Sequence, residues 1–218
     1  DNPAAIYYNP AGMTQLDGKL NASLGAAIFQ PFTTHTDNSG NKTDMRREIF
    51  TIPNVLAVSN FGLEKFAFGI GATSNWGTGT YWAEDSFSKY VATKSDLTSS
   101  TTMFTAAYKI NDNLSLGAAA DWVSLKTNTN KKLNQGTWGG SDGNSQLKGK
   151  DDNAWGYRLS ALYKLNKKHS FGFMYRSPID VKYKGKLYMD DLNGSGLGGY
   201  ADIFGGSSYE TDVTSTMT

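Results

Sequence analysis

Cysteine is absent from this chain of 218 residues. Disulfide frameworks, cysteine-ligated zinc and thiol catalysis are therefore excluded. Only two histidines occur, which disfavours a multi-histidine metal site, so we expect neither a metal nor a cofactor. The charges nearly balance, with 21 basic and 20 acidic residues, and this balance gives no electrostatic footprint for nucleic acid.

Long hydrophobic runs are also lacking. No apolar stretch approaches the roughly 18 residues that a transmembrane helix requires, and the mean hydropathy of −0.46 resembles that of a soluble protein. There are only 5 prolines, whereas 24 glycines accompany 13% aromatic residues. This composition is typical of β-rich proteins, including membrane barrels whose hydrophobicity is hidden by alternation.

Neither end of the chain looks like a natural domain boundary. It begins with Asp-Asn-Pro and no initiator methionine, and it ends within a stretch rich in Gly, Ser and Thr. We therefore expect a fragment or a processed chain. The missing signal peptide is consequently not evidence for a cytoplasmic protein.

The dominant hydrophobic period is two residues. In 66–73, Phe66, Phe68 and Ile70 share one parity, whereas mostly small residues occupy the other. The same alternation recurs in 113–125. Half-apolar alternation of this kind predicts β-strands with one apolar face.

About seven segments of about ten residues or more show this alternation, and a tilted strand of that length crosses a bilayer. Globular strands are shorter, with roughly five to six residues. We therefore predict an all-β fold, a transmembrane antiparallel β-barrel. The predicted strands are 19–32, 48–60, 64–75, 99–110, 113–126, 153–165 and 169–187.

The connections between these strands alternate in length. Short turns at one end and long loops at the other are typical of outer-membrane barrels. Aromatic residues near predicted strand ends, among them Trp122 and Trp155, fit interfacial girdles. A soluble β-sandwich or lipocalin-like barrel is the alternative. Tight turns are predicted at 60–64, 111–112 and 166–168, and long polar loops at 33–47, 76–98 and 127–152.

The segment before the first strand, 1–18, has two prolines and weak alternation, so it is a poor strand and is expected to dock against something. Its residues 5–13 read Ala-Ile-Tyr-Tyr-Asn-Pro-Ala-Gly-Met. This run resembles the hatch motif of the FadL/TodX family, outer-membrane transporters of long-chain fatty acids and hydrophobic compounds. Further stretches resemble the family in the same order, namely 52–55, 71–77, 155–165, 175–179 and 184–185.

The resemblance implies a barrel of about fourteen strands, of which this chain supplies about half. It divides the chain into an N-terminal hatch, 1–18, truncated at its start, and the N-terminal half of the barrel with long extracellular loops, 19–218. It also implies a monomer in the outer membrane of a Gram-negative bacterium, in contact with outer-membrane lipid.

The same resemblance implies passive uptake of long-chain fatty acids or other hydrophobic compounds. Uptake would run through a hatch-plugged barrel with a lateral exit at a kinked third strand. The implied partners are hydrophobic small molecules, fatty acids or aromatic hydrocarbons, and no enzymatic activity is expected. The alternatives are a structural or adhesive outer-membrane barrel without a transport role, and then an outer-membrane phospholipase.

Asn9, Pro10 and Ala11 form the predicted hatch site. An asparagine before proline favours an extended conformation, and its amide can satisfy free backbone groups. The resemblance implies that this tripeptide contacts the kinked third strand. A plain turn is the alternative.

Asn75, Trp76 and Gly77 mark the predicted kink. Glycine within a strand often accompanies a bulge or a bend. The resemblance implies an inward kink that opens a lateral gap in the wall, whereas a simple strand exit is the alternative.

Arg158 and Arg176 are predicted to face the lumen. If Leu165 pairs with His169 across the tight turn, the two arginines lie opposite each other, and their like charges repel unless an anion is near. Asp121 or a fatty-acid carboxylate would serve as that anion. A ligand site and a structural salt-bridge network both remain open.

The apolar loop residues Trp82, Phe87, Tyr90 and Val91 are a further expected substrate site. The resemblance implies an external hydrophobic groove built from long loops, and a self-packed loop core is the alternative. We find no nucleophile–base–acid set. The stretch 194–199 matches a dinucleotide-binding pattern, but no βαβ unit surrounds it, so we interpret it as a loop.

Overall fold

The computed structural model describes residues 2–166, 168–193 and 199–218. The glycine-rich stretch 194–199 lies outside this part of the chain, apart from its last residue. No helix in the described part is long and apolar enough to cross a membrane. The elements are α1 (Ala5–Tyr8), η1 (Pro10–Gln15), β1 (Leu20–Phe29), β2 (Thr34–Thr36), β3 (Lys42–Asp44), β4 (Phe50–Ser59), β5 (Phe66–Thr73), β6 (Gly77–Tyr81), β7 (Lys94–Lys109), β8 (Leu114–Leu133), η2 (Gly136–Trp138), β9 (Gly143–Lys164), β10 (Ser170–Arg176), β11 (Val181–Asp190), α2 (Tyr200–Phe204) and β12 (Tyr209–Met217).

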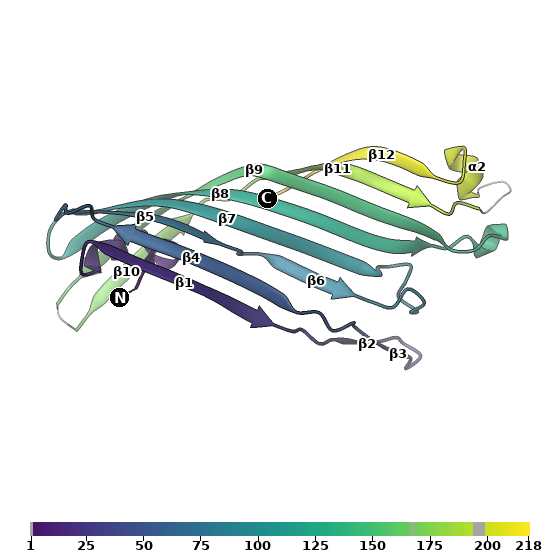
Figure 1. Ribbon diagram of the computed structural model, residues 1–218, viewed down its shortest axis with the longest axis horizontal. Helices are drawn as coiled ribbons and strands as arrows, with labels where there is room; N and C mark the ends of the chain where they lie inside the picture. Colours follow the sequence, from purple (N-terminus) through teal and green to yellow (C-terminus); the bar gives the residue numbers. More distant parts are fainter. Residues whose placement is uncertain (1, 167, 194–198) are drawn as a thin grey trace.

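One large antiparallel sheet contains most of these strands, in the order β1-β4-β5-β7-β8-β9-β11-β12 (Figure 1). β6 continues along β7 where β5 stops. In the same way β10 and β11 pair with successive parts of β9, β10 with 158–164 and β11 with 144–150. The sheet is not closed, and in the described residues β1 and β12 each pair with one neighbour only. The predicted all-β class and antiparallel pairing are confirmed.

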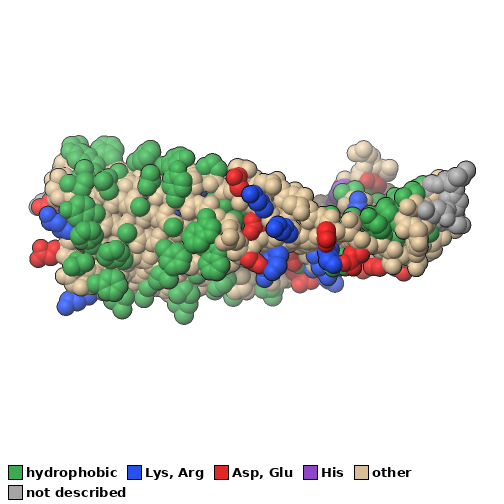
Figure 2. All heavy atoms as spheres, turned by 90° about the horizontal axis from the view of Figure 1, so that it is seen from above, with side chains coloured by type: hydrophobic (Ala, Val, Ile, Leu, Met, Phe, Trp, Pro, Cys, Tyr) green, Lys and Arg blue, Asp and Glu red, His purple; other side chains and the backbone are tan. Residues whose placement is uncertain are grey.

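One face of this sheet carries a band of exposed apolar side chains, which we call the apolar belt (Figure 2). The strand registers place its members on the same face, as the alternation predicts. Its members are Phe66, Phe68, Ile70, Phe104, Tyr108, Leu116, Trp122, Trp155, Tyr157, Leu159, Tyr163, Phe171, Phe173 and Tyr175. A belt of this kind is what the lipid-facing side of a barrel wall presents.

The opposite face is covered near the short turns by the N-terminal segment, residues 2–18. Ile6 and Met13 from this segment are buried against Leu56, Val58 and Met103 of the sheet. Burying such side chains stabilises the docked segment by roughly 1.5–3 kcal/mol each. The side chains on the inner face of the sheet therefore form the surface on which this segment packs.

The prediction of a long loop over 127–152 is wrong. β8 runs on to Leu133 and β9 begins at Gly143, so the connection shrinks to 134–142. The sequence here is polar on both parities, so hydrophobic alternation gives no signal, whereas the backbone ladder continues regardless of side-chain polarity. The β8–β9 hairpin therefore extends the large sheet, which we call the wall, beyond the apolar belt.

Three further boundaries differ from prediction. The expected loop 76–98 contains β6 and the start of β7, and the expected loop 33–47 contains the β2–β3 hairpin. β12 was not predicted, because its Thr and Ser residues resemble a linker, yet it pairs with β11 along nine residues.

The predicted strand 169–187 is split into β10 and β11. Ser177 to Asp180 leave the ladder between them, although Ser177 still donates its amide to the Tyr157 carbonyl oxygen at 2.9 Å. Pro178 cannot donate to a ladder, which favours a break at this point. Ile179 fills the space beside Gly156 on the inner face.

Candidate functional site

Asn9 fixes the junction between α1 and η1. Its Oδ1 accepts from the Ala11 amide at 3.1 Å, while its Nδ2 donates to the Ala161 carbonyl oxygen of β9 at 3.2 Å. The Ala11 amide also donates to Ser160 Oγ at 2.9 Å. One side chain therefore caps a helix and binds the wall, which satisfies donors that a helix start leaves free.

Glycines of the wall let the N-terminal segment approach closely. A Cβ added at Gly117 of β8 would lie 2.4 Å from the Ala11 nitrogen, and one at Gly69 of β5 would lie 2.8 Å from Ile6 Cγ1. Both distances are shorter than real side chains tolerate, so larger residues at these positions would push the segment away from the wall. Hydrophobic alternation does not identify such contacts.

The contact that the family resemblance implies for Asn9-Pro10-Ala11 differs from the observed one. Asn9 and Ala11 bind β9, and Pro10 lies against Gly117 of β8, rather than against the third predicted strand. The segment reaches that strand, β5, through Ile6 and Met13 instead. The expectation of a tripeptide contact with the kinked strand is therefore corrected.

Arg158 of β9 is the centre of a buried polar network. Its Nε and Nη2 donate to the two oxygens of Asp121 at 2.8 and 2.7 Å, and its Nη1 donates to the carbonyl oxygens of Ile6 and Tyr7 at 2.8 and 2.7 Å. The side chain is 0% exposed. Of the two expected roles, the structure assigns Arg158 to a salt-bridge network, which also holds α1.

Arg176 lies directly opposite Arg158, as predicted, and this register is confirmed. Its guanidinium lies 5.1 Å from the centre of the Tyr7 ring, whose face attracts a cation. No carboxylate in the described residues lies within ion-pair distance of it. Asp121 therefore pairs with Arg158 alone, and the positive charge of Arg176 is not neutralised.

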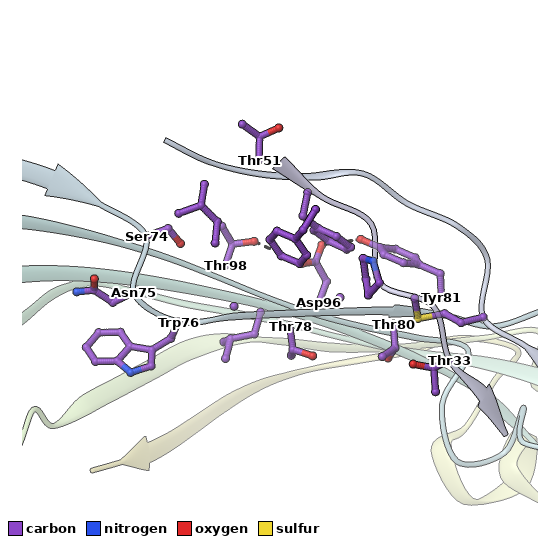
Figure 3. Close-up of a pocket in the computed structure, with 18 residues that line it drawn as sticks. Thr33, Thr51, Ser74, Asn75, Trp76, Thr78, Thr80, Tyr81, Asp96 and Thr98 are labelled. Atoms are coloured by element: carbon purple, nitrogen blue, oxygen red, sulfur yellow. Dashed lines mark hydrogen bonds between the residues drawn. The ribbon is translucent and has the colours of Figure 1, made fainter. Parts of the chain in front are cut away.

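The third predicted strand is interrupted at Ser74, Asn75 and Trp76, which join β5 to β6 (Figure 3). Ser99 of β7 fixes this bend, because its Oγ accepts from the Trp76 amide at 2.8 Å and also donates to the Trp76 carbonyl oxygen. Ser99 is 4% exposed. Gly77 begins β6, so the predicted kink residues lie on the bend; their role in transport stays a prediction.

A gap between β4 and β6 follows from this bend. β4 pairs with β5 only from Asn54 onward, and the described residues show no pairing between β4 and β6. The ladder stops beside Pro53, which has no N–H to donate. A hollow of about 630 Å³ lies here, lined by residues that include Asn75, Trp76 and Gly77.

Aromatic rings line part of this hollow, beside polar side chains that include those of Asp96 and Thr98. Phe50 stacks on Phe29 with 5.4 Å between ring centres and on Tyr81 with 6.4 Å. The Phe50 ring also covers Gly79, where an added Cβ would come within 2.2 Å of it. Rings from three segments thus pack across the gap, and the Arg46 amide donates to the Tyr81 carbonyl oxygen at 2.8 Å at its outer end.

The four apolar loop residues do not share one environment. Trp82 and Phe87 both pack edge-on against the His35 ring, with centres 6.2 and 5.0 Å apart, whereas the Tyr90 hydroxyl donates to Asp142 at 2.9 Å. Val91 is 79% exposed. The structure therefore brings two of them together against the β2–β3 hairpin and leaves their substrate role a prediction.

An ion pair ties the two outer loops together. Lys89 Nζ lies 2.6 Å from Asp142 Oδ2. The hydrogen bond between them raises the pKa of the Lys89 ammonium above 10.5 and lowers the pKa of the Asp142 carboxyl below 3.8. The Lys89 carbonyl oxygen also accepts from the Lys132 amide at 2.8 Å.

Reasoning from the sequence missed several residues of this site. Ser99, Ser160 and Gly117 are small residues in predicted strands, and their roles arise only from register. The part of the chain that the structure describes contains no group of three His, Asp or Glu side chains suited to a metal ion. The candidate site therefore consists of the inner face of the sheet, the bend at residues 74–76 and the docked N-terminal segment.

Comparison with known proteins gives a family. The family model described as "Outer membrane protein transport protein (OMPP1/FadL/TodX)" matches residues 1–217. A long-chain fatty acid transport protein of Escherichia coli O6:H1 is 26% identical over 88% of this chain and 48% of its own length. One from Salmonella typhi is 24% identical over similar shares, 88% and 48%.

Solved structures share the fold. A Pseudomonas aeruginosa FadL homologue superposes with a TM-score of 0.74 at 19% identity, over 98% of this chain and 58% of that one. The Pseudomonas putida toluene transporter TodX gives 0.70 at 19% identity, over 98% and 58%. This chain thus spans about half the length of the curated relatives that it matches.

Proposed function

This chain belongs to the outer membrane protein transport protein family (OMPP1/FadL/TodX), and on that premise we propose that it forms part of a passive route for hydrophobic molecules across the outer membrane. The observation that carries the proposal is the hollow of about 630 Å³ where β4 and β6 do not pair. A hydrophobic solute gains little from a water-filled pore, whereas a pocket with aromatic rings in its lining and a side exit keeps part of its surface away from water.

The lateral exit of this route lies at the bend that holds Asn75, Trp76 and Gly77. Opening it requires movement of Phe50 and Tyr81, which pack across the gap without a backbone ladder. Side-chain rotation takes place far more readily than the breaking of a strand pair. We therefore infer that the described wall opens at this bend.

The N-terminal segment, residues 2–18, is the hatch, and the rest of the chain, 19–218, is wall and loops. Arg158 and Asn9 hold the segment by hydrogen bonds to its backbone and to the wall. Transport requires this contact to loosen, since the segment covers the inner face of β5, β7 and β8. The protein acts as a monomer whose apolar belt contacts outer-membrane lipid, and it has no enzymatic role.

Arg176 receives the carboxylate of acidic ligands such as fatty acids. Its charge is not neutralised and it faces the same side as the hatch, whereas Arg158 already has Asp121 and two carbonyl oxygens as partners. Charge-assisted hydrogen bonds from a guanidinium to a carboxylate are short and strong. Aromatic hydrocarbons would pass without using this residue.

A reversible lock tests the hatch. These 218 residues contain no cysteine, so Ala11→Cys with Ser160→Cys introduces the only thiol pair in this part of the protein, where the Ala11 nitrogen and Ser160 Oγ are 2.9 Å apart. The full-length protein carrying this pair would be joined by oxidation or by a short thiol-reactive linker. Uptake of labelled oleate and toluene is then measured in cells that lack their own transporter.

The expected result is loss of uptake when the pair is joined and recovery after a disulfide is reduced. Thr34→Cys with Asp44→Cys, a register pair in the β2–β3 hairpin, is the matched control and should transport in both states. Undiminished uptake through the joined Ala11–Ser160 protein would disprove the hatch mechanism. Absence of uptake by the unsubstituted protein would instead favour a structural or adhesive role.

A further inference from the structure

The apolar belt ends at a pair of tryptophans on the side away from the short turns. Trp122 and Trp155 stack with ring centres 6.3 Å apart and both are exposed. Their indole N–H groups donate to the Asp152 carbonyl oxygen and to Asn153 Oδ1. Such half-polar rings mark the level where hydrocarbon gives way to head groups.

A row of lysines crosses the wall just beyond these tryptophans. Lys126, Lys150 and Lys184 are register partners on three adjacent strands, β8, β9 and β11, and all three are exposed. Lys126 follows Trp122 by four residues, about 13 Å along the strand. Like charges directly opposite each other destabilise a sheet, so this row needs anions nearby.

The neighbouring carboxylates satisfy only part of that need. Asp152 pairs with Lys150 at 2.7 Å, and Asp151 accepts from the backbone amides of Lys182 and Asn153 at 2.7 and 2.9 Å. In the described residues, no carboxylate lies within ion-pair distance of Lys126, Lys182 or Lys184. These three ammonium groups are available to an outside anion.

A hollow of about 590 Å³ lies among these groups, at the break between β10 and β11. Lys150, Lys182 and Lys184 line it, together with Trp155. Asp151, Asp152 and Asp180 also line it, and the Asp180 carboxylate accepts from the Thr218 hydroxyl at 2.7 Å. Figure 2 shows charged side chains gathered directly beside the apolar belt, on the side away from the short turns.

We propose that this hollow and lysine row bind the phosphate groups of a phosphorylated glycolipid in the outer leaflet, such as lipopolysaccharide. The acyl chains would lie on the apolar belt, the sugar would cover Trp155, and the phosphates would meet Lys126, Lys182 and Lys184. Basic clusters beside a membrane-spanning segment recognise anionic head groups in this way.

Position favours a lipid over a soluble anion. The lysines lie at the edge of the belt on the long-loop side, which faces outside in barrels of this kind. An anion held by its own acyl chains is confined to this level, so its local concentration is far above that of free phosphate. The proposal depends on the outer-membrane location and not on the transport route.

The test uses the full-length protein in detergent, with native mass spectrometry of bound glycolipid. The probes are bisphosphorylated lipid A and the same glycolipid without its phosphates. The test variant is Lys126→Gln, Lys182→Gln and Lys184→Gln together. The control variant removes the same charge from exposed lysines at the short-turn end, as Lys19→Gln, Lys65→Gln and Lys168→Gln.

We expect the test variant to bind bisphosphorylated lipid A roughly 100-fold more weakly, from about 1 kcal/mol per lysine, and the control variant to bind it unchanged. Heat-modifiable migration in gels verifies that both variants fold. Equal loss in both variants, or equal binding of the glycolipid without phosphates, would overturn the proposal. Complete displacement by millimolar inorganic phosphate would show a general anion site instead of a glycolipid site.

Discussion

The Arg158 guanidinium and the Asp121 carboxylate face each other diagonally across β9 and β8, joined by two hydrogen bonds of 2.8 and 2.7 Å. The remaining nitrogen of the guanidinium reaches the last carbonyl groups of α1. Two partners therefore share one cation, and neither the wall nor the N-terminal segment alone satisfies it. This arrangement couples the docking of the segment to a single aspartate of the wall.

Asp121→Ala should release the N-terminal segment and destabilise the protein. The substitution leaves the Arg158 charge buried without a counterion, and loss of one partner of a buried ion pair costs about 3–5 kcal/mol. Denaturant unfolding of the full-length protein measures the stability. Hydrogen exchange of the amides in α1 and η1 measures the release.

The double variant Asp121→Leu with Arg158→Met provides the control. It removes both charges, so it should be more stable than Asp121→Ala alone. A double variant as unstable as the single one would mean that packing, and not charge, accounts for the loss.

Asn9→Ala should weaken the hatch by a smaller amount, about 1 kcal/mol, since it removes the cap of η1 and the bond to Ala161. Asn9→Asp keeps the oxygen that caps η1 but loses the donor to Ala161. Fatty-acid uptake and hydrogen exchange at Ala11 separate the two contributions. Equal behaviour of both variants would assign the whole effect to the wall contact.

Much of the fold follows from the sequence, because alternation reports which strand face meets lipid. Phe66, Phe68 and Ile70 share one parity, and the structure places them in the apolar belt. The same signal fails beyond the belt. In 127–152 both parities are mostly polar, so alternation vanishes although the ladder persists.

The candidate site was less predictable than the fold. The opposition of Arg158 and Arg176 follows from the length of one tight turn, so it could be predicted from spacing alone. Ser99 at the bend and Gly117 under the segment gave no signal, because their roles depend on which distant backbone comes to rest on them. Such contacts arise from tertiary docking and have no local pattern.

Arg176→Gln should weaken carboxylate ligands by roughly tenfold or more and leave neutral hydrocarbons unchanged, since a hydrogen bond to a charged group contributes about 1.5–3 kcal/mol. Arg176→Lys retains the charge and should recover part of the affinity. Competition between oleate and toluene for the purified full-length protein measures the difference. Equal losses for both ligands would leave Arg176 with a structural role only.

Gly79→Val should obstruct the proposed lateral exit. Its side chain would enter the space of the Phe50 ring, where even a Cβ comes within 2.2 Å. Gly149→Val is the matched control, because Gly149 lies in β9 away from the bend and an added Cβ there has ordinary contacts only, the nearest with Thr127 Cγ2 at 3.4 Å. Uptake by cells should fall for the first variant and persist for the second, with equal amounts of protein in the outer membrane. Normal uptake with Gly79→Val would place the exit elsewhere.

The Lys89–Asp142 contact predicts a pH window for the outer loops. The pKa of the Asp142 carboxyl is lowered below 3.8, so the ionised carboxylate stabilises the joined loops above that pH. This stabilisation is lost as the pH falls through the lowered pKa. The pKa of the Lys89 ammonium is raised above 10.5, so the charged ammonium stabilises the joined loops below that pH. This stabilisation is lost as the pH rises through the raised pKa. The loops should remain joined between these limits.

A spin label at Val91→Cys, which is exposed and next to Tyr90 in the loop that carries Lys89, reports the mobility of that loop in the full-length protein. Mobility should stay constant around neutral pH and increase as the pH falls through the lowered pKa of the Asp142 carboxyl, because protonated Asp142 no longer attracts the ammonium. Asp142→Asn should be mobile already at neutral pH and show no acid step. A step of equal size in that variant would assign the transition to another carboxyl group.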